Sequence, residues 1–193
     1  MTKGYYFEDI YRCEMCGDDT PSHKILGQRL NQSQGVSPRK KIGISVSVKK
    51  CCKCNLVYSS PQPVPFDIQD HYGIPPDSYW LPIYFNVDEK YFLNQIQQAK
   101  KILAFKPETA ALDVGAGLGK CMIAMERAGF LSYGFEPSKP FYERAINKRG
   151  ISEEKMKLGA IEEGEYPHKS FDFITYGAVF EHLYHPAVSL KKD

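Results

Sequence analysis

The chain has 193 residues, of which 42% are hydrophobic, and a formal net charge of +2. This length and composition allow a sizeable buried core, and the near-neutral charge argues against a dedicated polyanion-binding protein. The early run from Tyr5 to Asp9 is charged and aromatic rather than apolar, and no stretch is long and apolar enough to span a membrane. We therefore expect a cytoplasmic globular protein without a membrane partner.

Two C-x-x-C pairs lie in the N-terminal part of the chain. Each is followed by a residue that tolerates positive φ, Gly17 or Asn55, and such turns direct backbone N–H groups toward thiolates. Two such pairs can complete a tetrahedral Cys₄ site in a segment too small to fold on its own core, and this arrangement resembles a zinc ribbon. The predicted ligands of a structural Zn²⁺ are Cys13, Cys16, Cys51 and Cys54.

The segment between the two pairs predicts a strand, because Ile42, Ile44, Val46 and Val48 alternate with glycine and serine. Cys52 remains an alternative to Cys51 as a ligand. Disulfides are disfavoured because they require an oxidising compartment.

Basic residues cluster at Arg39–Lys41 and around the second C-x-x-C pair. Because no aromatic residues are interleaved with them, we interpret them as a solvated rim of the ribbon, and a nucleic-acid partner is disfavoured. The proline-rich stretch Pro61 to Pro65 predicts a stiff exit from the ribbon.

An aromatic connector follows, and it includes Tyr72, Tyr79 and Trp80. Asp88 is then expected to cap a helix that packs on a sheet and ends before Lys106-Pro107. The apolar face of this helix comprises Phe92, Ile96, Ala99 and Leu103. We divide the chain into a ribbon-like domain (1–65), a connector with N-terminal helices (66–107) and a cofactor-binding domain (108–193).

The most informative segment runs from Thr109 to Arg127. An apolar strand ending at Val114 leads into three alternating glycines and then into a helix over Lys120–Arg127, a pattern typical of a nucleotide-type cofactor loop. A second strand, Leu131 to Phe135, ends on Glu136, at about the distance where an acidic residue binds ribose hydroxyls.

A further strand, predicted from Phe171 to Tyr176, leads into Glu181-His182-Leu183 and Pro186. With these residues the chain resembles the class I S-adenosylmethionine-dependent methyltransferases. The first motif of that family is matched by Asp113-x-Gly115-x-Gly117-x-Gly119, the second by Glu136, and the fourth by Phe171-Asp172 through Pro186.

A nicotinamide dinucleotide is the rival cofactor. Proteins that bind this cofactor have a final glycine in their loop at the position where this chain has Lys120. The carboxylate of Asp113 would repel a diphosphate but would attract ammonium and sulfonium groups. The fingerprint therefore favours the methyl donor.

The resemblance implies a set of site residues. S-adenosylmethionine is expected to contact Asp113, Gly115, Ala116, Gly117, Glu136, Pro137, Ala160, Ile161 and Tyr176. In methyltransferases of this type with an N-terminal ribbon, the aromatic connector closes over the donor and lines the acceptor site, which suggests this role for Tyr72 and Tyr79. His182 is the candidate base, since it follows a strand at the end where such chemistry occurs.

The expected fold class is α/β: a Rossmann-like methyltransferase sheet, preceded by a small zinc-ribbon β domain. The sequence predicts only four strands, at Ala110–Val114, Leu131–Phe135, Lys155–Leu158 and Phe171–Tyr176, where the resembling family has seven. We therefore expect a sheet that is incomplete at its C-terminal side, a chain that continues in a longer parent, and an exposed strand edge open to self-association. This chain alone is expected to bind the donor without efficient turnover.

The sequence is compatible with three functions. The leading one is methyl transfer to a small-molecule acceptor, and the ribbon-plus-methyltransferase layout resembles enzymes acting on nucleotide-linked sugars and polysaccharide precursors. The alternatives are an RNA or protein methyltransferase that docks through the ribbon, and a non-catalytic fragment that binds S-adenosylmethionine.

Overall fold

The computed structural model describes residues 4–31, 44–72, 77–103, 105–164, 166 and 170–192. The chain forms two compact units. The first contains Met1–His71 and Tyr184–Ala187, and the second contains Tyr72–Leu183 and Val188–Asp193. Among the described residues, no helix has the length and hydrophobicity that a membrane span requires.

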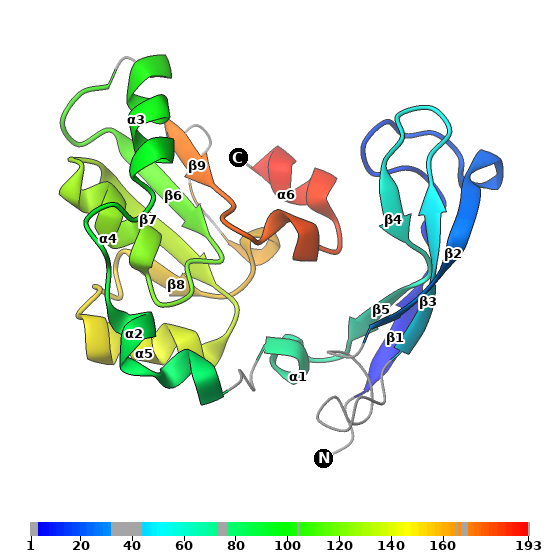
Figure 1. Cartoon of the computed structure of the whole chain (residues 1–193), viewed down its shortest axis with the longest axis horizontal. Helices are drawn as coiled ribbons and strands as arrows, with labels where there is room; N and C mark the ends of the chain where they lie inside the picture. Colours follow the sequence, from blue (N-terminus) through cyan, green and yellow to red (C-terminus); the bar gives the residue numbers. More distant parts are fainter. Residues whose placement is uncertain are drawn as a thin grey trace. The chain divides into compact units, whose positions relative to one another are not determined.

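The first unit is built from antiparallel strands (Figure 1). One sheet pairs the first strand with the last, and the other has the order β2-β3-β4. The strands are β1 (Tyr5–Glu8), β2 (Lys24–Asn31), β3 (Ile44–Lys50), β4 (Val57–Ser59) and β5 (Gln62–Pro65). The remaining elements are the 3₁₀ turn η1 (Thr20–Ser22) and the short helix α1 (Ile68–Tyr72), which ends on the first residue of the second unit.

The proline-rich stretch is not the stiff exit that the sequence predicted. All of it except Pro61 forms β5, which pairs antiparallel with β1 so that Phe7 lies opposite Pro63 and Tyr5 opposite Pro65. Among the described residues, β1 is the one strand paired with β5. A proline nitrogen in β5 can therefore face away from β1 without breaking the ladder. The predicted alternation in β3 holds at its start, where Ser45 is exposed and Val46 is buried, whereas Ile42 lies outside the described residues.

The second unit contains four parallel strands in the order β8-β7-β6-β9. They are β6 (Ala110–Val114), β7 (Leu131–Glu136), β8 (Met156–Leu158) and β9 (Phe173–Thr175). Among the described residues, β9 has a strand neighbour on one side only. The fold is therefore mixed α/β with a parallel sheet, as the sequence predicted. Strand β6 has the predicted bounds, and the ends of the other three strands differ from the predicted ones by at most two residues.

Helices and short 3₁₀ turns precede, connect and follow these strands (Figure 1). They are η3 (Asp77–Trp80), α2 (Pro82–Phe85), α3 (Leu93–Ile102), α4 (Lys120–Arg127), α5 (Lys139–Arg149), η4 (Ile161–Glu163), η5 (Phe180–His182) and α6 (Pro186–Lys192). Helix α4 has the bounds that the sequence predicted, and Gly129, which lies two residues after it, has φ of 91°.

The predicted cap of α3 is wrong. Helix α3 begins at Leu93, after Phe92 in a left-handed conformation with φ of 60°. The Asp88 carboxylate instead accepts a hydrogen bond from the Lys90 N–H at 2.7 Å. Such local turns compete with helix capping because the same short side chain can satisfy a backbone donor in either arrangement.

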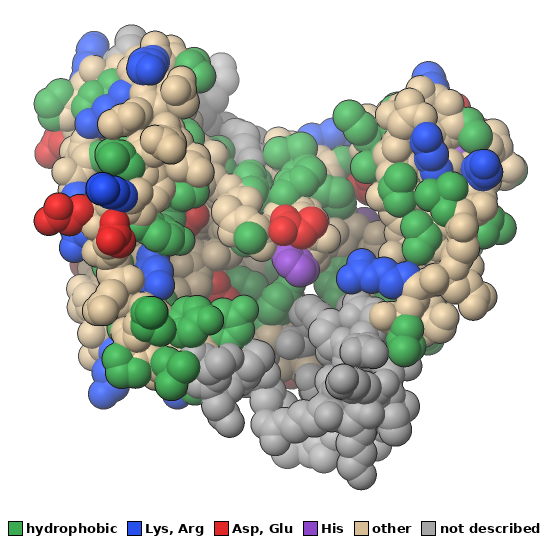
Figure 2. All heavy atoms as spheres, viewed as in Figure 1, with side chains coloured by type: hydrophobic (Ala, Val, Ile, Leu, Met, Phe, Trp, Pro, Cys, Tyr) green, Lys and Arg blue, Asp and Glu red, His purple; other side chains and the backbone are tan. Residues whose placement is uncertain are grey.

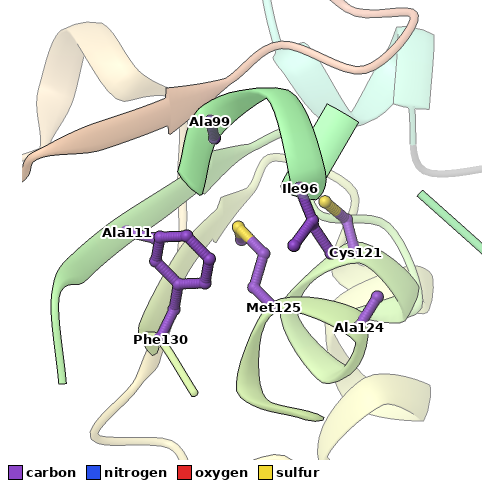
Figure 3. Close-up of a cluster of buried hydrophobic side chains, with 7 residues drawn as sticks. All are labelled: Ile96, Ala99, Ala111, Cys121, Ala124, Met125 and Phe130. Atoms are coloured by element: carbon purple, nitrogen blue, oxygen red, sulfur yellow. The ribbon is translucent and has the colours of Figure 1, made fainter. Parts of the chain in front are cut away.

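One face of the sheet packs against α3 and α4 around a buried hydrophobic cluster (Figure 3). Ile96 and Ala99 come from α3, as the apolar spacing predicted, and Ala111 comes from β6. The remaining buried members are Cys121, Ala124 and Met125 of α4, and Phe130. Strand alternation sends Leu112 and Val114 to the opposite face, where they pack with Phe135 and Ile161.

The cluster in Figure 3 generates a prediction about stability. Ile96 is 3% exposed and Ile102, on the same helix, is 82% exposed. Ile96→Ala should lower the free energy of unfolding of the second unit by about 2–5 kcal/mol, because it leaves a cavity. Ile102→Ala should change it by less than about 0.5 kcal/mol. Urea denaturation of both variants checks this, and equal midpoints would contradict the predicted packing of α3.

Candidate functional site

The order of the strands defines where a ligand can bind in the second unit. The chain passes from β6 outward through β7 and β8, and then returns to the other side of β6 with β9. In open parallel sheets a crevice forms at the carboxyl ends of the strands where the order reverses. The loop after β6, the end of β7 and the loop after β9 are the segments at this position.

The loop after β6 has the backbone conformation that its glycines permit. Gly115, Gly117 and Gly119 have φ of 69°, 57° and 71°, a region that residues with a Cβ atom rarely adopt. A Cβ atom at Gly115 would collide with the side chain of Val179, which follows β9. A Cβ atom at Gly117 would meet nothing within 4 Å, so this part of the loop faces open space.

Glu136, the last residue of β7, holds this loop in place. Its side chain is buried, and its Oε2 accepts a hydrogen bond from the Gly117 N–H at 2.6 Å. Its Oε1 accepts another from the Ser138 N–H at 2.7 Å. Burial raises the pKa of Glu136 to about 7, although both N–H groups favour the charged form. Each carboxylate oxygen keeps a further lone pair for a ligand donor.

Asp113 lies one residue before the end of β6 and is buried between strands. Its Oδ1 accepts a hydrogen bond from Thr175 Oγ1 at 2.6 Å, and this bond joins β6 to β9. Burial raises the pKa of Asp113 to about 6. Cys121 of α4 lies next to this pair, with Sγ 3.8 Å from Thr175 Oγ1. In this structure Asp113 therefore connects the first and fourth motifs.

Two tyrosines of the connector lie near these carboxylates. Burial raises the pKa of Tyr72, and the negative charges of Glu136 and Glu162 raise it further. Ser138 Oγ donates a hydrogen bond to the Tyr72 carbonyl oxygen at 2.7 Å. Burial likewise raises the pKa of Tyr91, and electrostatic interactions with Cys121 and Asp113 raise it further. Tyr91 was not among the site residues predicted from the sequence, and its place in the aromatic connector was the only available signal.

Tyr79 occupies a different position. Its ring packs against Tyr84 at 5.3 Å and against Phe141, in the first turn of α5, at 5.5 Å between centroids. It is 41% exposed. The neighbouring Trp80 carries the Arg144 guanidinium 3.7 Å above its ring. Tyr79 therefore contacts Tyr84 and the first turn of α5, a helix that begins three residues after Glu136.

The other residues predicted from the sequence lie on the loops around the crevice. Ala160 and Pro137 are half-buried, whereas Ile161 is buried in the cluster with Leu112, Val114 and Phe135. Ala116 is also buried, and its N–H donates to the Phe135 carbonyl oxygen at 2.8 Å. Tyr176 is half-buried and its ring meets Phe180 edge-on at 5.8 Å. His182 ends η5 and is exposed.

The first unit contains the predicted cysteine cluster. The Sγ atoms of Cys13, Cys16, Cys51 and Cys54 all lie within 4.8 Å of one another. Cys13 Sγ is 3.5 Å from Cys54 Sγ, and Cys16 Sγ is 3.6 Å from Cys51 Sγ. In a tetrahedral zinc site with Zn–S bonds of about 2.3 Å, sulfur atoms lie roughly 3.8 Å apart. The four thiols are therefore spaced as the ligands of one ion.

Two similar turns present these thiols. In the first, the Gly17 N–H donates to the Cys13 carbonyl at 2.8 Å and the Cys13 N–H to the Asp18 carbonyl at 2.8 Å. In the second, Asn55 and Leu56 make the corresponding bonds with Cys51 at 3.0 and 2.9 Å. Gly17 and Asn55 have φ of 73° and 67°, as the sequence predicted.

Backbone donors act on the thiols of these turns. The N–H groups of Cys54 and Lys53 donate toward Cys51 Sγ, and they lower the pKa of Cys51 to about 6. The alternative ligand Cys52 is exposed, and its Sγ donates to the Ser22 carbonyl at 2.9 Å. The structure therefore includes Cys51, and not Cys52, in the cluster.

Comparisons with known proteins find similarity over part of the chain. Residues 112–192 match a family model described as "Methyltransferase domain". The YcgJ protein from Bacillus subtilis is similar in structure, with a TM-score of 0.44, 22% identity, and coverage of 52% of this chain and 44% of that one. An Anabaena variabilis protein described as a methyltransferase from an antibiotic biosynthesis pathway has a TM-score of 0.43 and 20% identity, covering 56% and 41% of the two chains. The chain thus spans less than half the length of either protein. A search of curated proteins finds no match.

The buried carboxyl groups predict how stability depends on pH. Because burial raises the pKa of Glu136 from 4.5 to about 7, the folded chain keeps this proton where the unfolded chain has lost it. The free energy of unfolding should therefore fall as pH rises through this range, and Asp113, raised from 3.8 to about 6, acts in the same direction. In the Glu136→Gln variant, the decrease in the free energy of unfolding with rising pH should be smaller than in the parent chain by roughly 3 kcal/mol, at about 1.4 kcal/mol per pKa unit.

Urea denaturation at about pH 4.5 and about pH 7.5, without ligand, checks this prediction. Glu154→Gln, which changes an exposed carboxyl group in the same unit, serves as the control and should keep the pH dependence of the parent chain. A Glu136→Gln variant with the same pH dependence would contradict the assigned role of burial.

Proposed function

We propose that this chain is an S-adenosylmethionine-dependent methyltransferase acting on a small-molecule acceptor. One observation carries the proposal: at the end of β7, the buried Glu136 carboxylate is bonded to the Gly117 N–H of the glycine loop. This arrangement lies within the segment that matches the methyltransferase-domain family.

The residues present fit the donor. The lone pairs that Glu136 keeps can accept hydrogen bonds from two ribose hydroxyls, and the open space at Gly117 allows a ligand to approach the backbone closely. Pro137 and Ala160 would flank the adenine, with Ile161 supporting it from the core. Tyr72, close to Glu136 and Glu162, is suited to cover the ribose side.

When bound, S-adenosylmethionine supplies a methyl group on a positively charged sulfur. The chain's own residues have to align the acceptor with that group and keep water away. His182, exposed in the loop after β9, is our candidate base for removing a proton from the acceptor. Tyr79 is the second candidate, because it is part of the aromatic segment that packs on the start of α5.

Nucleotide-linked sugars or polysaccharide precursors are the acceptor class that we favour. Over the described residues on the face in Figure 2, Lys and Arg side chains lie singly or in small groups among hydrophobic and acidic ones. A surface that binds RNA usually carries a continuous basic stripe with aromatic residues interleaved. The described residues on this face carry no such stripe, which supports a small acceptor; the basic cluster Arg39–Lys41 lies outside the described residues.

We further propose that the cysteine cluster holds one structural Zn²⁺. The sulfur spacing supports this, together with backbone N–H groups that stabilise thiolate in the second turn. The first unit has two small antiparallel sheets, so a metal that crosslinks both turns would supply stability that so small a core lacks. Thiolate ligands persist in a reducing compartment, which is consistent with a cytoplasmic location.

Donor binding tests the first part of the proposal. Glu136→Ala should weaken binding of S-adenosylmethionine, or of its demethylated product, by about 1–3 kcal/mol in titration calorimetry, because charge-assisted hydrogen bonds are lost. Glu154→Ala is the control, since it removes an exposed carboxyl group distant in sequence from the loop. Unchanged affinity in Glu136→Ala would overturn the assignment of the donor site.

Radiolabelled donor distinguishes the acceptor classes. The chain is mixed with a panel of nucleotide sugars, RNA and protein extracts. Label should enter the nucleotide-sugar fraction, at the low turnover that the sequence leads us to expect of this chain. His182→Ala should slow this transfer further while leaving donor affinity intact. Label in RNA or protein would favour docking through the ribbon. Donor binding without transfer to any of these acceptors would favour a non-catalytic role.

Metal analysis tests the zinc site. After extensive dialysis the purified chain should retain about one zinc, because a closed Cys₄ site releases metal slowly. Cys16→Ser should lose this zinc and unfold the first unit, while circular dichroism still reports the α/β sheet. Cys52→Ser, the adjacent cysteine outside the cluster, should keep it. A zinc-free parent chain would overturn the proposal.

A further inference from the structure

A second group of potential ligands lies beside the cysteine cluster. It consists of Asp18, His23 and Cys51, whose ligand atoms lie within 4.8 Å of one another. Asp18 follows the first turn directly and Cys51 opens the second, whereas His23 comes from the segment between η1 and β2. Neither Asp18 nor His23 was among the metal ligands predicted from the sequence.

His23 has the surroundings of a metal ligand. Its side chain is fully buried, and its Nδ1 lies 2.5 Å from the Tyr58 hydroxyl. Its other ring nitrogen, Nε2, is buried and has no hydrogen-bond partner among the described residues. Histidines that bind metal through one nitrogen typically hydrogen-bond through the other, which fixes the orientation of the ring. Buried polar atoms without a partner are uncommon in folded proteins.

Asp18 lies beside His23 and is the second ligand of this group. Its Oδ2 lies 3.6 Å from His23 Nε2, and it accepts a hydrogen bond from Ser22 Oγ at 3.1 Å. In a tetrahedral site with bonds of about 2.1 Å, neighbouring nitrogen and oxygen ligands lie roughly 3.4 Å apart. Both side chains are thus held by a second partner, Tyr58 or Ser22, at a separation that suits one ion.

We propose that His23 Nε2, Asp18 Oδ2 and Cys51 Sγ form a second, weaker site for a divalent transition metal, with the Cys51 thiolate shared between the two ions. A nitrogen, an oxygen and a thiolate suit Zn²⁺ and its neighbours in the first transition row. Three protein ligands leave one coordination position open, whereas the Cys₄ site is closed. The second ion should therefore exchange readily and be lost on dialysis. This inference rests on the zinc site proposed above, because Cys51 belongs to both sets.

Cobalt provides the test. The full chain, dialysed so that it keeps only its tightly bound zinc, is titrated with Co²⁺, and total metal is counted by elemental analysis while visible absorption follows Co²⁺. The parent chain should take up one Co²⁺ in addition to the zinc. His23→Gln and Asp18→Asn should retain the zinc and take up none.

Two further variants sharpen the result. Asp19→Asn is the matched control, since Asp19 is the next residue, has a 75% exposed side chain and pairs with Arg12. This variant should bind Co²⁺ as the parent does. Tyr58→Phe keeps all three ligands but removes the hydroxyl group at Nδ1, and it should weaken Co²⁺ binding by about 10–100-fold while zinc is retained.

The outcomes separate the two metal proposals. A parent chain that holds zinc but takes up no Co²⁺ overturns the second site and leaves the Cys₄ proposal intact. Equal uptake of Co²⁺ by the Asp18→Asn and Asp19→Asn variants has the same consequence. A parent chain without tightly bound zinc overturns the Cys₄ proposal instead. If His23→Gln loses both metals because the first unit unfolds, the Tyr58→Phe affinity and the parent stoichiometry decide.

Discussion

The second unit depends on one buried carboxylate. Glu136 accepts hydrogen bonds from Gly117, in the loop after β6, and from Ser138, just before α5, so a single side chain fixes two loops relative to each other. Ser138 in turn donates to the Tyr72 carbonyl, which extends this network to the connector. Burial strengthens these bonds but disfavours the charge, and the same group is therefore both a structural anchor and the natural acceptor for ligand hydroxyls.

A second buried carboxyl group supports the loop from the other side. Asp113 is bonded to Thr175, so β6 and β9 are joined at the end of the sheet where Val179 also packs beside Gly115. Asp113 of the first motif thus helps to hold β9, which belongs to the fourth motif, in place. Because close packing transmits small displacements, changes in either strand should reach the glycine loop.

The first unit follows a different principle. Its sheets are small, and the two cysteine turns are stabilised by matching backbone hydrogen bonds rather than by a large core. Four thiols lie at ligand spacing, and a buried histidine and a carboxylate lie beside one of them. The candidate metal ligands therefore lie in this unit, whereas the α/β unit carries the glycine loop.

Several features could be predicted from the sequence because they depend on local spacing. The C-x-x-C turns, the three positive-φ glycines and the bounds of α4 are set by residues within a few positions of one another. The four parallel strands were also predictable, since apolar runs bounded by turn residues indicate buried strands. Local reasoning failed where two local structures compete, as at Asp88, and where a distant partner is required, as for β5 pairing with β1.

The sequence by itself therefore determined the two kinds of chemistry in this chain, a glycine loop with its acidic residue and a set of paired cysteines. Only the tertiary structure decided which side chains meet them. It brought Tyr72 to Glu136, Thr175 to Asp113 and His23 to the cysteine cluster, and it excluded Cys52 from that cluster. These contacts join residues that are tens of positions apart, and their geometry depends on sheet order and turn direction, which no local pattern specifies.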